Sequence, residues 1–278
     1  MVRQHTDVAV NTNPASERSS KEKECSVTVV VPTYHEVKNL RPLVMRISGA
    51  MAKAKRPYEI IVVDDDSRDG TDQAVRELNE LGYPVRLIAR IGERSLSSAV
   101  IRGFSEANGE TLICMDADLS HPPEAIPTIL ECLDEPGVDF VLGSRYALGG
   151  STDEQWGLLR WLNSKIAIAL AKPFTSLKDP MSGFFAIPKT VYEKAAPLNP
   201  VGYKIALELI VKCNCSMIRE IPIHFAQRRF GESKLSLTER LNYMRHLNRL
   251  LRNQFCHWRS DLLRRLIGMF RKKRGPDA

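Results

Sequence analysis

The stretch YEIIVVDDDSRDGTDQAVRELNEL, residues 58–81, gives the clearest indication of the fold. It joins a mostly apolar run at 58–63 to a helix-like pattern at 69–81 through a turn rich in Asp, Ser and Gly. An apolar run without regular polar alternation is typical of a strand that is buried on both faces, as in parallel sheets. Asp69 or Thr71 can cap the helix that follows. The stretch therefore predicts a buried strand and a crossover helix.

The same unit recurs on both sides of this stretch. Strands are expected at 27–31, 85–89, 111–115 and 138–143, and helices at 39–54, 95–107 and 122–133. Buried strands that alternate with helices indicate a parallel sheet with right-handed crossovers. We therefore expect an α/β fold, a Rossmann-like, mostly parallel sheet with helices on both faces.

The chain changes character after residue 150. Helix 154–172 is rich in Trp, Leu and Ile and carries basic residues. This pattern alone is equally typical of a core helix and of an interfacial helix. Beyond it we expect strands at 182–187 and 216–225 and a helix at 202–212. Residues 236–274 predict two basic amphipathic helices, which either lie on a membrane or pack on the domain and leave a solvated basic tail.

Composition is that of a globular protein, with 278 residues, 43% hydrophobic and 26% charged. Residues 1–25 read as a disordered polar tail without the apolar region of a secretory signal, and residues 26–235 as the main domain. No window approaches the ~18 apolar residues of a membrane span. Six cysteines without a CxxC pattern favour structural roles and a reducing compartment. We therefore expect a soluble or peripheral protein.

The positive charge is concentrated at the C-terminal side. The formal net charge is +7, yet residues 228–274 alone hold 14 Lys and Arg against three acids. A basic segment of this kind favours an anionic partner, which can be a membrane surface, a nucleic acid or phosphates.

Acidic residues follow three of the expected strands. Glu36 follows the first strand, Asp64 to Asp66 follow the second, and Asp116 and Asp118 follow the fourth. Because parallel sheets bind ligands at the carboxyl ends of their strands, these acids predict one shared site. The sequence has neither GxGxxG after the first strand nor GxxxxGK[ST], so neither glycine-rich loop holds a phosphate.

The segment MDADLSHPPE, residues 115–124, suits a metal site. Asp116 and Asp118 are two positions apart, so on a strand they point the same way. Their oxygens are the ligands that Mg²⁺ or Mn²⁺ prefers, and such ions commonly bridge to substrate phosphates. The same residues also allow a structural reading in which Ser120 or His121 caps a helix that begins with Pro122 and Glu124. Both readings can hold together.

Seven motifs carry a resemblance to a known family. In chain order they are VVVPTYHE, IVVDDDSRDGT, MDADLSHPPE, GSRY, KDPMSGFF, GYKIALEL and RRFGESKL. Over about residues 26–252 the chain resembles the inverting family-2 glycosyltransferases, and more closely the dolichyl- or polyprenyl-phosphate mannosyltransferases. The resemblance implies a GT-A-type glycosyltransferase fold.

The resemblance also implies a set of site residues. The positions implied for the nucleotide sugar are Pro32, Tyr34, Glu36, Val63, Asp65, Asp116, Ala117, Lys204, Arg228 and Lys234. The positions implied for the acceptor phosphate are Arg145, Arg160 and Ser164. Those implied for the metal are Asp116, Asp118 and Ser120, and those for catalysis are Asp118, Arg145 and Arg228. Some relatives carry Gln at position 120, and the shorter Ser120 hydroxyl departs from that pattern.

The implied activity is inverting transfer of mannose from GDP-mannose to dolichyl or polyprenyl phosphate, with Mg²⁺ or Mn²⁺. A phosphate monoester has a second pKa near 6, so this acceptor is an anionic nucleophile at neutral pH without a general base. Together with a lipid substrate of this kind, the pattern of helix 154–172 favours an interfacial helix. The enzyme would be cytoplasmic and peripheral on the cytosolic face of a membrane, held by its own basic helices or by a separate membrane subunit, with no nucleic acid partner. Two alternatives stay open: a UDP-sugar donor, as in a polyprenyl-phosphate glucosyltransferase, and a non-catalytic protein that binds membrane or nucleic acid through its basic arm.

Overall fold

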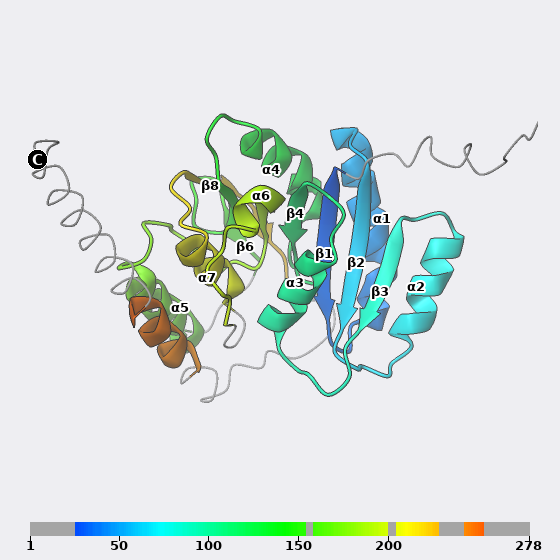
Figure 1. Ribbon diagram of the computed structural model, residues 1–278, viewed down its shortest axis with the longest axis horizontal. Helices are drawn as coiled ribbons and strands as arrows, with labels where there is room; N and C mark the ends of the chain where they lie inside the picture. The colour runs from blue at the N-terminus through cyan, green and yellow to red at the C-terminus, as the bar shows by residue number, and fades with distance from the viewer. Residues whose placement is uncertain (1–25, 154–157, 200–203, 228–241, 253–278) are drawn as a thin grey trace, which may run out of the picture.

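The computed structural model describes residues 26–153, 158–199, 204–227 and 242–252. In these residues a seven-stranded sheet has the order β3-β2-β1-β4-β7-β5-β8 (Figure 1). Its strands are β1 (Val27–Thr33), β2 (Tyr58–Asp64), β3 (Val85–Ala89), β4 (Thr111–Cys114), β5 (Phe140–Ser144), β7 (Phe185–Pro188) and β8 (Ile218–Pro222). All neighbours pair in parallel except β7, which is antiparallel to β4 and β5. The expected mostly parallel sheet is confirmed.

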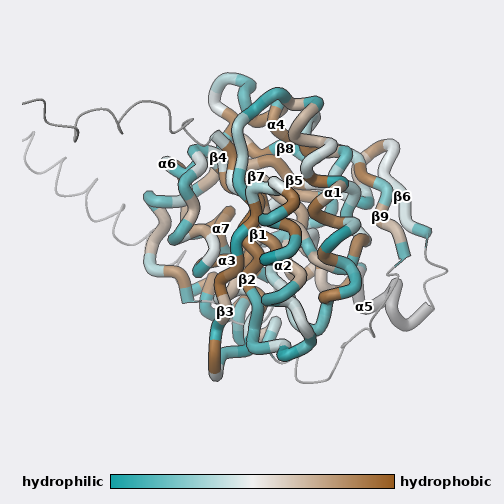
Figure 2. The backbone as a smooth tube through the Cα atoms, turned by 90° about the vertical axis from the view of Figure 1, so that its right-hand side faces the viewer, coloured by the Kyte–Doolittle hydropathy of each residue, from teal (hydrophilic) through white to brown (hydrophobic). Residues whose placement is uncertain are grey.

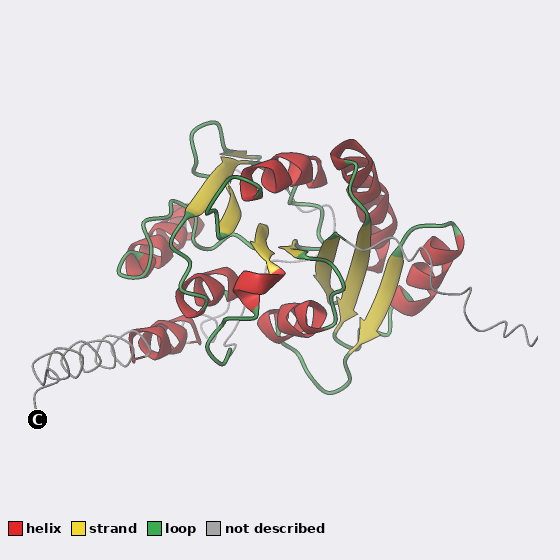
Figure 3. Cartoon of the chain, turned by 45° about the horizontal axis from the view of Figure 1, so that its top comes forward, coloured by secondary structure: helices red, strands yellow, loops and turns green. Residues whose placement is uncertain are grey.

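Helices cover both faces of the sheet (Figure 3). They are α1 (Val37–Ala54), α2 (Thr71–Glu80), α3 (Leu96–Ser105), α4 (Ile126–Leu133), α5 (Leu158–Ala171), α6 (Lys189–Tyr192) and α7 (Ile205–Lys212). A 3-10 turn at Pro123–Ala125 precedes α4. Two short strands, β6 (Ser151–Thr152) and β9 (His224–Phe225), pair in parallel outside the main sheet. The sequence predicted one strand at 216–225, which is wrong because Ile223 separates β8 from β9.

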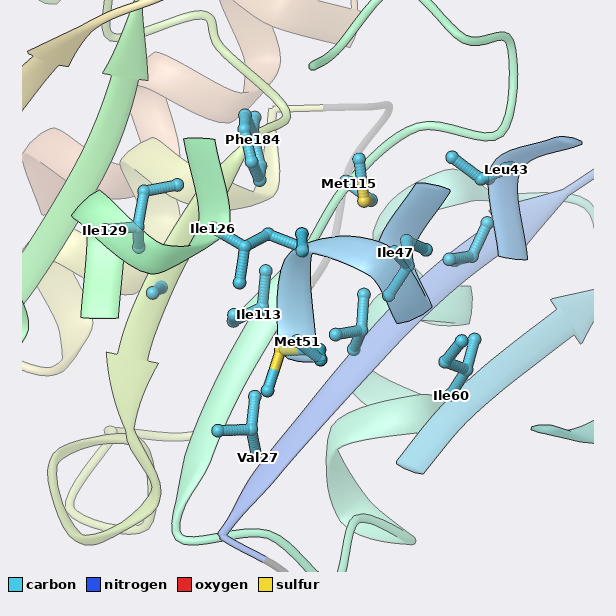
Figure 4. Close-up of a cluster of buried hydrophobic side chains, with 14 of the residues drawn as sticks. Val27, Leu43, Ile47, Met51, Ile60, Ile113, Met115, Ile126, Ile129 and Phe184 are labelled. Carbon is cyan, nitrogen blue, oxygen red and sulfur yellow. The ribbon is translucent and has the colours of Figure 1, made fainter. Parts of the chain in front are cut away.

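Alternate residues of the central strands enter two different cores. Val29 and Val31 of β1 pack with α1, α2 and α4, whereas Val30 packs with α3 and α7. Figure 4 shows the first core, where Leu43 and Ile47 of α1 meet the strand residues. The central strands are coloured as hydrophobic in Figure 2, and their residues in these cores are buried. Since each face is covered, β1 needs no polar alternation, as its sequence predicted.

A third core joins the C-terminal half. The helix described over 242–252 lies beside α5 (Figure 1). Its Tyr243, Leu247 and Leu250 are buried with Leu207 of α7 and Ala171 of α5. The Tyr243 hydroxyl donates to the Ala167 carbonyl at 2.7 Å. The described part of the basic C-terminal region therefore packs against the domain on one face.

The direction of β7 brings a loop to the functional edge of the sheet. Because β7 is antiparallel, it begins at the edge where its parallel neighbours end. The segment 179–184 before it consequently lies at that edge, next to the residues that follow β4 and β5.

Within the described residues, no helix is both long and apolar enough to cross a membrane.

Gly109 is a position where close packing requires a missing side chain. A Cβ there would lie 2.5 Å from the Thr28 backbone nitrogen, and the Gly109 N–H donates to the Thr28 hydroxyl at 2.9 Å. We expect Gly109→Ala to lower the free energy of unfolding by about 1–3 kcal/mol, because backbone cannot move away as a side chain can. Chemical denaturation measures this change.

Gly49 in α1 is the matched control for this prediction. A Cβ at Gly49 meets nothing within 4 Å. Gly49→Ala should raise the free energy of unfolding by up to about 1 kcal/mol, since Ala favours a helix interior over Gly. Equal destabilisation by the two substitutions would contradict the packing described at Gly109.

Candidate active site

The ends of β1 and β2 are tied together by Asp64. Its carboxylate accepts from the Ser67 backbone N–H at 2.9 Å and from the Thr33 hydroxyl at 3.1 Å. The Ser67 hydroxyl in turn accepts from the backbone N–H of His35 at 2.9 Å. The first of the three acids after β2 therefore organises the loops rather than facing a ligand.

Asp69 performs a similar task at the start of two helices. Its carboxylate accepts from the Thr71 N–H at 3.1 Å, from the Thr71 hydroxyl at 2.7 Å and from the Val37 N–H at 3.2 Å. The residue at the capping position of α2 is Gly70, whose φ is 96°. The prediction that Asp69 or Thr71 is itself the N-cap residue is wrong, because the turn needs a positive φ there and a glycine adopts it without strain.

Asp65 is held by a buried arginine. Arg90, which follows β3, donates from Nε to Asp65 Oδ1 at 2.7 Å and also from Nη2, while the Ser95 backbone N–H donates to Oδ2 at 3.0 Å. Both side chains are less than a tenth exposed. Arg90 also donates to Ser98 at 2.6 Å and to Glu93 at 3.0 Å. Sequence reasoning missed Arg90, although an arginine directly after an apolar strand is a usable signal.

The other residues implied for the nucleotide lie at the same edge. Pro32 of β1 and Val63 of β2 are register partners and are buried. The Arg94 guanidinium lies 4.5 Å from the centre of the Tyr34 ring. Glu36 accepts from the Asn39 side chain at 2.6 Å. These residues thus lie along the carboxyl ends of β1 and β2, next to the Arg90–Asp65 pair at the end of β3.

Asp116 and Asp118 follow β4 at the centre of this edge. The Asp116 side chain is 27% exposed, whereas Asp118 is buried. Asp118 Oδ1 accepts from the Ser120 backbone N–H at 3.0 Å and from its hydroxyl at 2.5 Å. Leu119 between them has a φ of 63°, which folds the chain back so that this contact can form. The Ser120 hydroxyl therefore holds Asp118, and its direct ligation of a metal stays a prediction.

His121 fixes the backbone of the same turn. Its Nδ1 accepts from the Asp116 backbone N–H at 3.1 Å, and its ring lies between Phe184 and Phe225 at 5.4 Å from each. The helical capping predicted for Ser120 or His121 is wrong, because Pro122 stands at the start of the 3-10 turn and no side chain caps it. Both residues instead bond back to the two aspartates.

Glu124 does not complete a capping box either. Its carboxylate pairs with Arg46 of α1 at 2.7 Å. This exposed pair joins α1 to the start of α4, and the hydrogen bond lowers the pKa of Glu124.

The donor set after β4 fits a hard divalent cation. A Cβ at Gly183 would lie 3.0 Å from Asp116 Oδ1, so only glycine fits closely against this side of the carboxylate. Carboxylate oxygens suit Mg²⁺ or Mn²⁺. No group of three His, Cys, Asp or Glu is gathered in the described part of the chain. Mg²⁺ that is bound by one or two carboxylates usually completes its shell with waters and substrate phosphates.

Arg145 follows β5 and is bound to a buried carboxylate. It donates from Nε and Nη2 to the two oxygens of Asp179, each at 2.7 Å. Burial alone would lower the pKa of Arg145, but the hydrogen bonds to Asp179, and more weakly the charge of Asp116, raise it. Because β4 and β5 are both antiparallel to β7, their carboxyl ends lie at the same edge of the sheet. Asp179 is a second residue that sequence reasoning missed.

Five further residues are implied in the site, and the structure describes the backbone of three of them. Lys204 stands at the N-cap of α7. Arg160 and Ser164 belong to α5. The Lys165 Nζ of this helix lies 4.7 Å from the centre of the Tyr146 ring, so α5 passes close to the residue that follows Arg145. Arg228 and Lys234 lie outside the described residues. The structure therefore brings the β1, β2, β4 and β5 ends together, with α5 beside them.

Comparison with known proteins agrees with this arrangement. The family model described as glycosyl transferase family 2 matches residues 28–195. The chain is 47% identical over 249 residues to a dolichol-phosphate mannosyltransferase of Mycosarcoma maydis, covering 87% of this chain and 84% of that protein. It is 44% identical over 231 residues to the one of Saccharomyces cerevisiae, covering 80% and 86%. With the one of Pyrococcus furiosus it shares 46% over 230 residues, 81% of this chain but only 64% of that longer protein.

Solved structures share the fold at low sequence identity. Mannosyl-3-phosphoglycerate synthase from Rubrobacter xylanophilus superposes with a TM-score of 0.62 at 20% identity, over 83% of this chain and 75% of the other. Glucosyl-3-phosphoglycerate synthase from Mycobacterium tuberculosis, in complex with Mn²⁺, UDP-glucose and phosphoglyceric acid, superposes with a TM-score of 0.55 at 17% identity, over 76% and 73%. The resemblance seen in the sequence is confirmed: the chain belongs to glycosyl transferase family 2 and is a glycosyltransferase with a GT-A-type fold.

Proposed function

We propose that this chain transfers mannose from GDP-mannose to dolichyl or another polyprenyl phosphate, with inversion at the sugar. The observation that carries this proposal is the shared carboxyl edge of the sheet, to which the strands bring the acids at the ends of β1, β2 and β4 and the Arg145–Asp179 pair after β5. Relatives at 44–47% identity over most of the chain are named dolichol-phosphate mannosyltransferase, which supports both the sugar and the acceptor.

The donor would occupy the β1–β2–β4 side of this edge. Tyr34 offers a ring, Glu36 and Asp65 offer carboxylates for base and ribose, and Asp116 and Asp118 face the diphosphate. A divalent cation bound there supplies positive charge to the departing diphosphate. The named Mn²⁺ complex of a structural neighbour supports a metal of this kind. Asp118 is held still by Ser120 for this purpose, and Asp116 by the turn that His121 fixes.

The acceptor would approach from the β5 side. Its phosphate is anionic at neutral pH and needs no side chain to remove a proton. The task of the chain is then to place the phosphate oxygen in line with the sugar and to balance charge. Arg145 suits this task because a guanidinium binds phosphate with two parallel hydrogen bonds. Arg160 and Ser164 of the adjacent α5 are proposed to complete this site.

The enzyme is proposed to work as a peripheral protein on the cytosolic face of a membrane. Ile166 and Leu170 of α5, and Met244 and Leu251 of the helix at 242–252, are all more than a third exposed. Arg245, Arg249 and Arg252 are exposed on the same C-terminal helix. Apolar side chains beside cations are typical of helices that lie in the headgroup region of anionic membranes. Anchoring is by these helices or by a separate membrane subunit.

Removal of Asp118 tests the enzymatic proposal. Purified protein with GDP-mannose, dolichyl phosphate and Mn²⁺ should form a lipid-linked mannose that mass spectrometry detects. Asp118→Ala should lower kcat at least roughly hundredfold, because a metal ligand and its charge are lost. Asp72→Ala is the control, since Asp72 pairs with Arg76 on the exposed surface of α2. Full activity of Asp118→Ala would contradict the metal site, and transfer of glucose from UDP-glucose but no mannose would contradict the donor.

Arg90 should matter for donor binding without contact to the donor. Arg90→Gln leaves Asp65 buried without its partner, and we expect it to lower the free energy of unfolding by about 3–5 kcal/mol. Thermal shift should show a smaller stabilisation by GDP than in the wild type, because Asp65 is no longer oriented. Arg76→Gln, which breaks an exposed pair, should leave the free energy of unfolding nearly unchanged and the response to GDP intact. An Arg90→Gln protein that responds fully to GDP would show that Asp65 needs no such orientation.

The exposed apolar residues of the C-terminal half predict membrane binding. The double substitution Leu170→Ser with Met244→Ser should lower sedimentation with anionic liposomes and leave the thermal shift by GDP unchanged. Leu81→Ser is the control, because Leu81 is 61% exposed at the end of α2, which lies at the opposite end of the molecule from α5 (Figure 1). Equal liposome binding by both variants would argue for anchoring by a separate subunit.

A further inference from the structure

We propose that Asp179 is a positioning residue for the acceptor: it holds the Arg145 guanidinium in the orientation that meets the acceptor phosphate. The inference rests on the proposed function, since it names a residue that prepares the acceptor side of that site. Asp179 itself is fully buried and acts through Arg145.

Three hydrogen bonds define the pair. Asp179 Oδ2 accepts from Arg145 Nε at 2.7 Å and from the Arg145 backbone N–H at 3.1 Å, and Oδ1 accepts from Nη2 at 2.7 Å. Both the main chain and the side chain of Arg145 are therefore fixed by one carboxylate. Since Asp179 takes the Nε edge of the guanidinium, the Nη1 edge must face away from it. A planar group with one edge fixed has a single direction for its other edge.

Aromatic rings limit the arginine further. The guanidinium carbon lies 5.1 Å from the centre of the Phe225 ring and 5.5 Å from that of Tyr146. The Arg145 side chain is only 11% exposed. Ring contact and burial restrict the Arg145 side chain, and its hydrogen bonds to Asp179 fix the orientation of the guanidinium plane.

The backbone of Asp179 is held by a strand of the sheet. Glu220 of β8 accepts from the Asp179 N–H at 3.0 Å and from the Lys178 N–H at 2.9 Å. Glu220 is the register partner of Leu142 in β5, three positions before Arg145. The positions of Arg145 and of Asp179 are thus both set by the paired strands β5 and β8.

The loop that holds Asp179 also borders the metal site. The Ser182 N–H donates to the Asp179 carbonyl at 3.1 Å, which closes a turn, and the next residue, Gly183, lies against Asp116. One short loop therefore contacts the acceptor residue and the proposed metal ligand. A purely structural tie between β5 and the loop would not require this double contact.

Steady-state kinetics of Asp179→Asn tests the role. Asparagine keeps the shape but loses the charge and one acceptor position. We expect the KM for dolichyl phosphate to rise roughly tenfold, the size of effect typical for a hydrogen bond to a charged group, while the KM for GDP-mannose stays within about twofold. Binding of farnesyl phosphate without donor, followed by titration calorimetry, should weaken by a similar factor.

Asp139→Asn is the matched control. Asp139 precedes β5 at the opposite end, and its Oδ2 likewise accepts three hydrogen bonds, from the Ser216 N–H at 2.8 Å, the Ser216 hydroxyl at 2.9 Å and the Met217 N–H at 3.0 Å. Its loss should lower the melting temperature but leave the KM for dolichyl phosphate unchanged. A rise in that KM equal to the one in Asp179→Asn would reduce the role of Asp179 to stability and overturn the inference.

A double-mutant cycle separates action through Arg145 from independent action. On an Arg145→Gln background, Asp179→Asn should raise the acceptor KM by no more than about twofold. Independent, multiplying effects would overturn the inference, as would an Asp179→Asn protein that binds farnesyl phosphate as tightly as the wild type. A wild-type protein that transfers no mannose to any polyprenyl phosphate would instead reject the proposed function, while the calorimetric titration would still decide the role of Asp179.

Discussion

The structure depends on the parallel pairing of β1 with β2 on one side and β4 on the other. This pairing buries both faces of β1, so that helices must cover the sheet on both sides. It also sends the carboxyl ends of these strands to a single edge. Acids that are far apart in the sequence, such as Glu36 and Asp118, lie at the same edge only because the strands run in the same direction. The site is a consequence of the topology.

Most of the charged groups at this edge are engaged in holding other groups. Asp64 and Asp69 tie the loops after β1 and β2 to the helices, and Arg90 holds Asp65. Ser120 holds Asp118, and Asp179 holds Arg145. Asp65, Asp118 and Arg145 therefore each have a partner that orients them, which for Asp65 and Arg145 comes from another part of the chain. Groups that are already oriented need little reorganisation when charge develops in the transition state.

Much of the fold could be predicted from the sequence because its signals are local. The apolar run of β2 and the acids after β4 are visible in short windows, and both lie where they were expected. The direction of β7 could not be predicted, since an apolar strand reads the same in either direction. Asp179 and Gly183 were missed for this reason: their place at the site follows from that direction.

Local capping rules failed where side chains had long-range partners. Glu124 fits a capping box by spacing, yet it pairs with Arg46 of another helix. His121 fits a helix start, yet it accepts from the backbone N–H of Asp116. Arg90 and Asp65 are 25 positions apart in the chain, and no short window shows that they meet. Contacts between strand ends are fixed by tertiary structure, so the sequence pattern alone cannot assign them.

One edge of the sheet is proposed to hold donor and acceptor together. This can be tested with a crystal grown with Mn²⁺, GDP-mannose and a short polyprenyl phosphate, measured by anomalous diffraction at the manganese edge. We expect an anomalous peak within coordination distance of Asp116 and Asp118, a diphosphate bound to that ion, and the lipid phosphate on Arg145. A manganese ion or a nucleotide bound elsewhere on the protein, with Asp116 and Asp118 unligated, would contradict this proposal.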